Sequence, residues 1–252
     1  MEKIENERPE LAEQFNAGHQ EYSSFIETDP IRQFLHYPNV IKELGEVSGQ
    51  HILDIGCGDG LFDRKLAKEF GAKIVGYDIS PNLVEKAKQK ERETSLGIEY
   101  QISDPTAFNI GRRFDNAVSV TVMPYASDEA YLKNFFAFAY NHLKEKGKFV
   151  SVVFNPDFSK FNEILMNRFF RKGDGVKVEF DFLAPQSKAV QFSAELAQFS
   201  KEAYETGARG GGFGKIKWQK LMPTDEGVEK LGADFWQKAN DEQPYALIIA
   251  KK

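Results

Sequence analysis

Apolar runs of strand length alternate with longer amphipathic stretches along most of the chain. A run that is apolar on both faces is typical of a parallel strand covered by helices on each side, whereas apolar residues three and four positions apart indicate a helix. This alternation predicts an α/β fold with a mostly parallel sheet. The strands expected for that sheet are residues 51–55, 73–80, 98–104, 114–123, 148–154, 215–221 and 245–250.

Two regions depart from this alternation. Residues 15–44 are rich in aromatic side chains and are interrupted by Pro30 and Pro38, so we expect short helices there. They are expected to cover the glycine-rich turn described next, although the aromatic side chains could equally pack against the sheet edge. After the fifth strand we expect an amphipathic stretch at 158–171, a strand at 176–183, a helix at 189–204 and a mobile glycine-rich loop at 207–214.

The sharpest local signal is a glycine-rich turn directly after the first expected strand. Gly56, Gly58 and Gly60 occupy alternate positions there. Glycine allows positive φ and has no Cβ, so this backbone can turn tightly and approach a ligand closely. Asp59 is expected to cap the helix that follows. Leu61 stands where a dinucleotide-binding loop needs its third glycine, and the Gly-Lys pair of a P-loop is missing, so neither of those loops is indicated.

Acidic residues end the next two expected strands. Asp78 ends the second strand, where a carboxylate can accept hydrogen bonds from both hydroxyls of a ribose. NAD enzymes share this chemistry, and an ordinary turn residue is the alternative for Asp78. Asp104 ends the third strand, and the alternative for it is a turn-forming role before Pro105.

Together these residues resemble the motifs of the class I S-adenosylmethionine-dependent methyltransferases. In that family an acidic residue, here Asp54, stands at the end of the first strand and a G-x-G-x-G loop follows it. The resemblance extends from about residue 50 to the C-terminus. It implies a Rossmann-like sheet of seven strands with helices on both faces and an antiparallel last strand, and it implies S-adenosyl-L-methionine as the cofactor.

The resemblance also implies where the cofactor binds. In the family, the acidic residue after the third strand meets the adenine amino group, and the end of the fourth strand faces the methyl group that is transferred. The residues expected to bind the cofactor are Tyr22, Asp54, Gly56, Cys57, Gly58, Asp78, Ile79, Asp104, Pro105, Thr121 and Met123. The motifs identify no dedicated catalytic base, and the polar groups that remain as catalytic candidates are Tyr22, His36 and Tyr125.

In related small-molecule methyltransferases the region after the fifth strand often forms a lid over the substrate. We therefore expect one domain over residues 1–252, with an N-terminal helical cover at 1–48 and a lid insertion at 156–188. Short patterns near both ends are similar to the toxoflavin-synthase-like group, which methylates ring nitrogens of a flat heterocycle. These patterns are Tyr22…Asp29-Pro30-Ile31-Arg32…His36-Tyr37-Pro38 and Asp234-Phe235-Trp236…Pro244-Tyr245.

The expected function is therefore methyl transfer to a small-molecule acceptor, such as a ring nitrogen of a heterocycle. The alternatives are a protein or RNA methyltransferase and a non-catalytic regulator that binds the cofactor. A net charge of −5 disfavours a nucleic-acid partner. We also expect no membrane partner, and a monomer or a homodimer.

The remaining composition bears on the compartment. Cys57 is the single cysteine, which excludes an internal disulfide and suits a reducing compartment. The charged N-terminal residues do not resemble a signal peptide, so we expect a cytoplasmic protein. Four scattered histidines and one cysteine give no metal-binding pattern, and we expect no metal.

Overall fold

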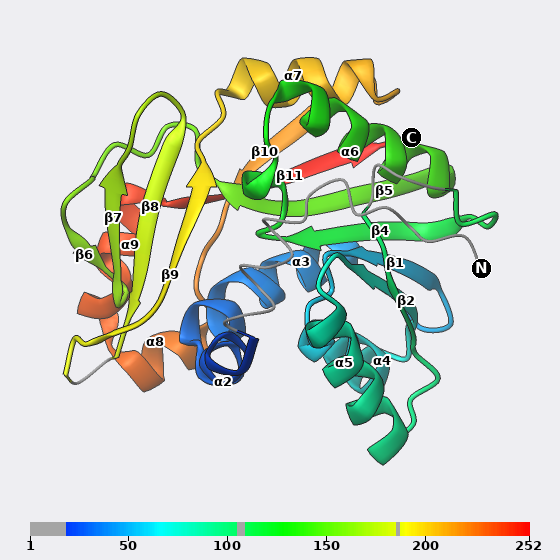
Figure 1. The fold of residues 1–252 in the computed structure, drawn as a ribbon, viewed down its shortest axis with the longest axis horizontal. Coiled ribbons are helices and arrows are strands. Elements are labelled where there is room, and N and C mark those ends of the chain that lie inside the picture. The colour runs from blue at the N-terminus through cyan, green and yellow to red at the C-terminus, as the bar shows by residue number, and fades with distance from the viewer. Residues whose placement is uncertain (1–18, 105–108, 185–186) are drawn as a thin grey trace.

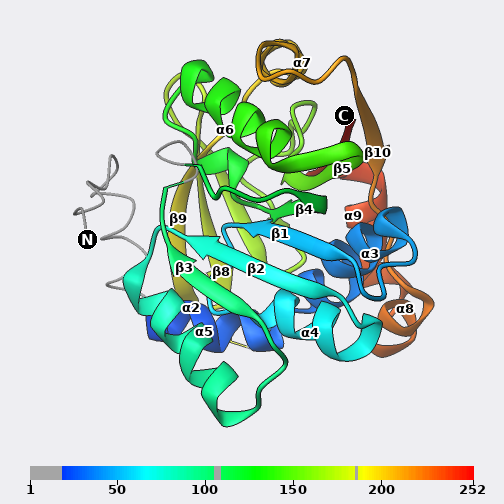
Figure 2. The same ribbon diagram turned by 90° about the vertical axis from the view of Figure 1, so that its right-hand side faces the viewer.

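A seven-stranded sheet forms the centre of the molecule (Figures 1 and 2). The computed structural model describes residues 19–104, 109–184 and 187–252. The strands lie in the order β10-β11-β5-β4-β1-β2-β3. Their bounds are β1 His51–Ile55, β2 Lys73–Asp78, β3 Glu99–Ile102, β4 Phe114–Val120, β5 Leu143–Phe154, β10 Ile216–Lys220 and β11 Tyr245–Lys251.

The pairing confirms the expected sheet. Strand β1 runs parallel to β2 and β4, and β3 and β5 continue the parallel set on either side. Strand β11 is antiparallel to both β5 and β10. The chain order reverses between β1 and β4, and in open α/β sheets such a reversal creates a crevice at the carboxyl ends of the strands. The glycine-rich turn follows β1 directly at this edge.

Helices cover both faces of the sheet (Figure 1). Alternate residues of a strand point to opposite faces, and accordingly Ile52 and Leu53 of β1 belong to different apolar clusters. The cluster of Ile52 includes side chains of α3 (Tyr37–Leu44), α4 (Leu61–Phe70) and α5 (Pro81–Glu93). The cluster of Leu53 includes side chains of α6 (Glu129–His142) and α7 (Lys201–Gly210). The sheet is therefore buried on both faces, as its apolar strands predict.

A second, four-stranded sheet is inserted after β5 and is named here the lid sheet. It consists of β6 (Ile164–Leu165), β7 (Arg168–Lys172), β8 (Lys177–Leu183) and β9 (Val190–Ala197), each antiparallel to its neighbour. The helix expected at 189–204 is wrong, because the first half of that stretch forms β9. Residues 190–197 pair with the whole of β8, and this partner outweighs the local helical spacing. The insertion thus extends beyond residue 188.

The glycine-rich stretch at 207–214 is partly helical, which corrects the expectation of a mobile loop. Helix α7 continues to Gly210 because these glycines lie against α6. A Cβ on Gly211 would lie 2.7 Å from the backbone nitrogen of Ala137, and one on Gly207 would lie 3.4 Å from the ring of Phe136. The glycines therefore allow two helices to pack closely.

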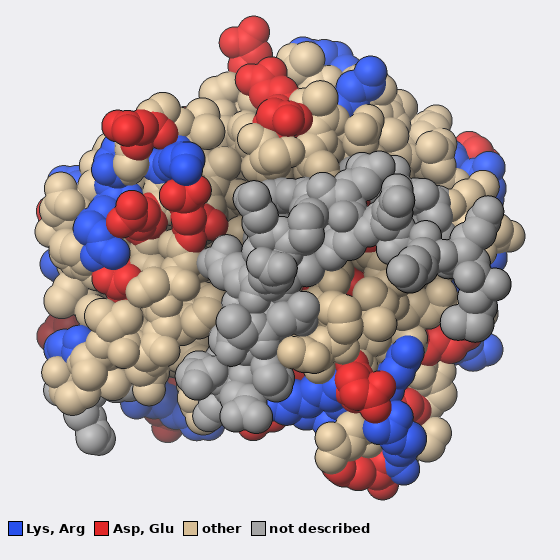
Figure 3. Space-filling model, viewed as in Figure 1, with Lys and Arg blue, Asp and Glu red and all other residues tan. Residues whose placement is uncertain are grey.

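The N-terminal elements lie between the lid sheet and α5 (Figure 1). Helix α2 (His19–Thr28) contacts both α5 and β9, and the π-helical turn η1 (Arg32–His36) leads into α3. Near the C-terminus, α8 (Asp225–Leu231) packs beside η1, and α9 (Ala233–Glu242) packs on α8 and lies behind the lid sheet in Figure 1. On the face in Figure 3, Lys and Arg are interspersed with Asp and Glu over α5 and the lid sheet. In the described ranges, no helix has the length and apolar character needed to cross a membrane.

Candidate active site

The glycine-rich turn after β1 has the conformation that its sequence predicts. Gly56, Gly58 and Gly60 have φ values of 86°, 57° and 76°. A Cβ on Gly56 would lie 2.2 Å from Val122, and one on Gly60 would lie 2.3 Å from the hydroxyl of Tyr100. The Cβ position of Gly58 is open, with no atom within 4 Å. The outer glycines are thus required by packing, and the middle glycine leaves space beside the backbone.

Asp59 does not cap α4, which corrects the sequence prediction. Gly60 is the N-cap residue, and no side chain accepts a hydrogen bond there. The Asp59 carboxylate instead accepts from Lys90 Nζ at 2.8 Å, and Lys90 also donates to Glu27 Oε1 at 3.0 Å. Lys90 therefore connects the glycine-rich turn and α5 to helix α2.

Asp78 lies at the end of β2, directly beside the turn. Its Oδ2 accepts from the Gly58 backbone N–H at 2.8 Å, and its Oδ1 accepts from the Ser80 N–H at 2.9 Å. Burial raises the pKa of Asp78, and these N–H groups partly offset the rise. Ser80 accepts from the Leu83 N–H at 3.3 Å and caps α5. The loop and the carboxylate therefore hold each other in place.

A cavity of about 950 Å³, its open mouth included, lies at this edge of the sheet and is named here the large cavity. The turn, the ends of β2 and β4 and the N-terminal elements surround it. Tyr37 stacks on Phe62 at 4.5 Å and forms part of the wall. The expected site residues that line it are Asp54, Gly56, Cys57, Gly58, Asp78, Ile79, Thr121 and Tyr125.

The structure places other expected site residues elsewhere. Met123 is fully buried in the cluster beneath α6 and does not line the cavity. Asp104 is buried outside the lining and accepts a hydrogen bond from the Tyr131 hydroxyl at 3.1 Å, while Tyr131 itself does line the cavity. Pro105 lies outside the described residues. Tyr22 falls within α2, but its side chain is not among those that the structure describes.

Two buried carboxyl groups lie beneath the turn, and only one of them was expected. Asp54 belongs to the motif, whereas Asp63 of α4 was missed because nothing in a helical sequence distinguishes a buried aspartate from a solvated one. Both oxygens of Asp63 and Oδ1 of Asp54 have no hydrogen-bond donor among the described groups. Burial raises the pKa of Asp54 to about 7 and that of Asp63 well above its usual range. Asp63 therefore holds its proton more strongly than an ordinary aspartate does, and its carboxyl group donates a hydrogen bond to Asp54.

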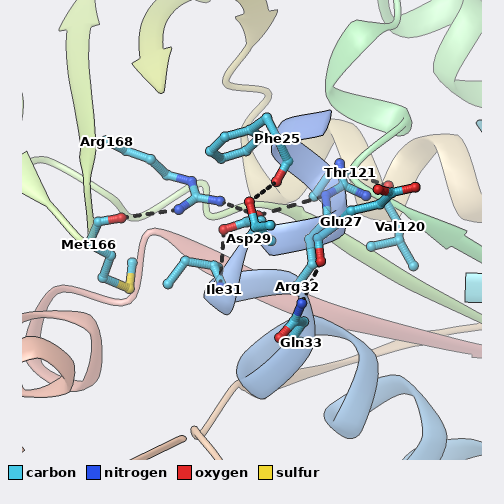
Figure 4. A network of polar contacts seen from close by, with 11 residues as sticks. Phe25, Glu27, Asp29, Ile31, Arg32, Gln33, Val120, Thr121, Met166 and Arg168 are labelled. Carbon is cyan, nitrogen blue, oxygen red and sulfur yellow. Dashed lines mark hydrogen bonds and ion pairs between the residues drawn. The ribbon is translucent and has the colours of Figure 1, made fainter. Parts of the chain in front are cut away.

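Arg32 and Thr121 meet at the end of β4 and were also missed as a pair. Arg32 Nη2 donates to Thr121 Oγ1 at 3.1 Å, across 89 positions of sequence (Figure 4). Thr121 has a φ of 59°, which is strained for a β-branched residue. Such strain costs on the order of 1–3 kcal/mol and is concentrated at functional sites. The sequence signal was slight: an arginine within an aromatic-rich N-terminal region.

A smaller cavity of about 430 Å³, its open mouth included, adjoins the first and is named here the lid cavity. Arg32, Thr121 and Tyr125 line both cavities. The remaining walls come from η1, β5, β11 and the lid sheet. The lining residues used below are His36, Phe154, Arg168, Phe180, Phe182 and Tyr245.

His36, one of the expected catalytic candidates, lies in the wall of the lid cavity. It is 2% exposed, and neither ring nitrogen has a hydrogen-bond partner within the described structure. Burial, together with the positive charges of Arg32 and Arg168, holds the pKa of His36 well below its ordinary value. The imidazole is therefore neutral, and its ring packs edge-on against Tyr245 at 4.5 Å.

Comparisons with known proteins agree with this geometry. A family model described as "Methyltransferase domain" matches residues 52–147, which run from β1 into β5. A ubiquinone biosynthesis O-methyltransferase from Coxiella burnetii is 32% identical over 123 residues, covering 48% of this chain and 50% of that protein. The chain thus spans about half the length of the curated relatives it matches.

Solved structures extend the likeness to the rest of the fold. An S-adenosylmethionine-dependent methyltransferase from Clostridium acetobutylicum superposes with a TM-score of 0.63 at 20% identity, covering 94% of this chain and 99% of that one. One from Mesorhizobium loti superposes with a TM-score of 0.61 at 22% identity, covering 85% and 96%. The strand order, the glycine-rich turn and these likenesses agree. Residues 52–147 therefore match the methyltransferase domain, and the chain as a whole has the fold of the S-adenosylmethionine-dependent methyltransferases.

Proposed function

We propose that this protein transfers a methyl group from S-adenosyl-L-methionine to a small-molecule acceptor. The observation that carries the proposal is the pair of adjoining cavities at the carboxyl ends of the parallel strands. The large cavity contains the glycine-rich turn and Asp78, and the lid cavity is walled by aromatic side chains. The two meet at Thr121 and Tyr125, where donor and acceptor would face each other.

The large cavity fits the cofactor. The open Cβ position of Gly58 leaves room for a ligand against the backbone, and Asp78 presents a half-buried carboxylate beside it. In this proposal Asp78 accepts hydrogen bonds from the ribose hydroxyls, while Ile79 and Leu83 supply apolar surface for the base. When bound, the cofactor supplies an activated methyl group on a sulfonium.

The chain itself contributes alignment and exclusion of water. Holding two reactants in the productive geometry can account for about 7–11 kcal/mol of a reaction barrier. The strained Thr121 and its Arg32 partner fix the junction between the cavities, and the lid sheet closes one side of it. A base is needed only for an acceptor that must lose a proton, and neutral His36 is the group available in the lid cavity.

The acceptor class follows from the shape of the lid cavity. Its aromatic walls suit a flat ring, and a ring nitrogen of a heterocycle is the acceptor atom that we propose. The curated relatives are named for O-methylation, so a ring hydroxyl is the second candidate. A macromolecular acceptor is disfavoured because the described part of the lid cavity lies behind the lid sheet and the N-terminal elements.

The test is calorimetric titration of the purified protein with S-adenosylmethionine, S-adenosylhomocysteine and NAD. We expect both sulfur compounds to bind and NAD not to bind. Asp78→Asn should weaken S-adenosylhomocysteine binding about 10- to 100-fold, because hydrogen bonds to a charged group contribute ~1.5–3 kcal/mol. The melting temperature of the variant should fall only moderately, because asparagine keeps one of the two acceptors for the Gly58 and Ser80 N–H groups and burial already disfavours the charged carboxylate.

Asp174→Asn is the matched control, because Asp174 is an exposed turn residue of the lid sheet. Its affinity for S-adenosylhomocysteine should equal that of the wild type. Binding of NAD without either sulfur compound would overturn the proposal. Cofactor binding without turnover on any small-molecule extract would favour the non-catalytic regulator instead.

A further inference from the structure

We infer that the lid cavity recognises a flat, conjugated acceptor that carries an anionic oxygen, held by Arg168 and His36. The inference rests on the proposed function, because it names the acceptor class of the same site. It depends on the charges, the unpartnered atoms and the ring faces of the cavity wall. None of these was apparent from the sequence motifs.

The charged side chains among the described residues that line the lid cavity are the guanidinium groups of Arg32 and Arg168. Arg168 Nη2 lies 2.6 Å from Asp29 Oδ2, and Arg32 Nε lies 3.9 Å from the same oxygen (Figure 4). One buried carboxylate thus faces two guanidinium groups. No Asp or Glu is found among the described residues that line the lid cavity, and His36 is neutral. Arg168 therefore presents a buried guanidinium to a wall that has no described carboxylate, and an anion is favoured in such a setting of low dielectric constant.

Buried polar atoms on the same wall have no partner. Arg168 is 2% exposed, and its two terminal nitrogens donate to Met166 O at 3.1 Å and to Asp29. Its Nε has no acceptor in the described structure, and neither ring nitrogen of His36 has a partner. Buried polar groups are nearly always hydrogen-bonded, and an exception requires an explanation. A ligand with an acceptor oxygen and a second polar atom would satisfy both side chains.

The remaining wall favours a planar ring. The ring centroids of Phe180 and Phe182 on β8 are 4.6 Å apart. Those of Phe154 and Tyr245 on the main sheet are 6.3 Å apart. The Arg168 guanidinium lies over the ring of Phe182 at 4.9 Å, so its orientation is fixed by packing as well as by Asp29. Aromatic rings prefer offset or edge-on neighbours. A conjugated acid fits this wall better than a flexible aliphatic acid does.

The experiment uses a pair of probes with the same shape and different charge. Wild-type protein is saturated with S-adenosylhomocysteine and titrated by calorimetry with benzoate and with benzamide at pH 7.5. We expect benzoate to bind at least about tenfold more tightly, which corresponds to ~1.4 kcal/mol. Cyclohexanecarboxylate, which has the charge without the flat ring, should bind more weakly than benzoate.

Two variants assign the preference to the named side chains. Arg168→Lys keeps the charge beside Asp29 but loses the planar fork, so benzoate binding should weaken about tenfold. Arg171→Lys is the matched control: Arg171 is on the same strand, pairs with Asp181 and does not line the cavity. His36→Gln should weaken both probes, whereas His51→Gln, at an exposed strand start, should weaken neither.

The outcomes separate the inference from the proposed function. If S-adenosylhomocysteine does not bind, the proposed function fails and the inference fails with it. If S-adenosylhomocysteine binds but benzoate and benzamide bind equally, or neither binds, the inference alone is overturned. The wild-type comparison decides this even if a variant folds poorly.

Discussion

Asp54 and Asp63 place two carboxyl groups in an apolar layer beneath the glycine-rich turn. Their pKa values in the folded protein exceed the ordinary value of 3.8, with that of Asp54 at about 7. The folded protein therefore keeps protons that the unfolded chain releases above pH 3.8. Stability consequently falls as the pH rises from that value through about 7 and beyond.

Asp63→Asn tests this linkage. Asparagine keeps the size of the side chain and a donor for Asp54, but it needs no proton to remain neutral. The variant should therefore lose less stability than the wild type between pH 5 and pH 8, with a melting temperature roughly 3 °C or more above it at pH 8. Urea unfolding at several pH values measures this directly. Parallel pH profiles for the two proteins would show that Asp63 ionises freely in the folded state.

At the residue scale, the sequence located the turn and Asp78 because both depend on local backbone requirements. Gly56 and Gly60 each have a positive φ, which glycine adopts without the strain that other residues incur. Thr121 was among the expected residues, but its strain, its contact with Arg32 and the burial of Asp63 could not be predicted, because they arise only when distant elements meet. Motifs therefore identified the residues around the large cavity better than those around the lid cavity.

At the scale of elements, helix α2 joins the lid sheet to the large cavity. Phe25 of α2 packs on Phe182 of β8 at 4.3 Å, and Ile26 lines the cavity. The exposed part of the connection is the ion pair of Lys90 with Glu27, and surface pairs of this kind contribute only about 0–1 kcal/mol. Helix α2 is therefore held mainly by its contacts around the cavity.

Ligand binding should accordingly slow amide hydrogen exchange in α2 and β8. We expect S-adenosylhomocysteine to increase protection several-fold in α2, and an acceptor-like acid such as benzoate to extend this protection to β8. Helix α7, which packs on the opposite face of the main sheet, is the internal control and should not change. Equal exchange in α2 with and without ligand would mean that these elements do not close over the site.

The lid sheet also shows where element prediction from sequence stops. The strand at 176–183 was expected from its alternation and is present as β8. The stretch at 189–204 was assigned to a helix, because the pairing of Ala194 with Phe180 that makes it a strand is not visible locally. Helix α7 could not be predicted from its sequence for the same reason. Its glycines are explained by close packing against α6, which is not visible locally.

For the whole molecule, the alternation of apolar runs was sufficient to predict the class of the main sheet, and the family resemblance supplied its antiparallel last strand. Neither the alternation nor the resemblance predicts the ion pair of Asp29 with Arg168. These residues are 139 positions apart, and their contact joins the N-terminal elements to the lid sheet. This ion pair and the apolar cluster around it pack the two separate sheets against each other. Side chains of β7 and β8 share a single buried cluster with those of β4 and β5.

We therefore predict that the two sheets unfold as one unit. Phe154 of β5 is 1% exposed and contacts Phe158, Phe170 and Tyr245, which links the main sheet to the lid sheet. Phe154→Ala should lower the free energy of unfolding by about 3–5 kcal/mol. Its urea transitions, followed by circular dichroism and by tryptophan fluorescence, should still coincide.

Val190→Ala, at an exposed position of β9, is the control and should unfold at nearly the wild-type urea concentration. Trp218 and Trp236 report on the C-terminal part of the main body, whereas circular dichroism reports on both sheets. If circular dichroism showed an earlier step that fluorescence does not follow, the lid sheet would be an independently folding unit. In that case the acceptor side of the site could open without unfolding the cofactor side, and closure over the substrate would be set by the lid alone.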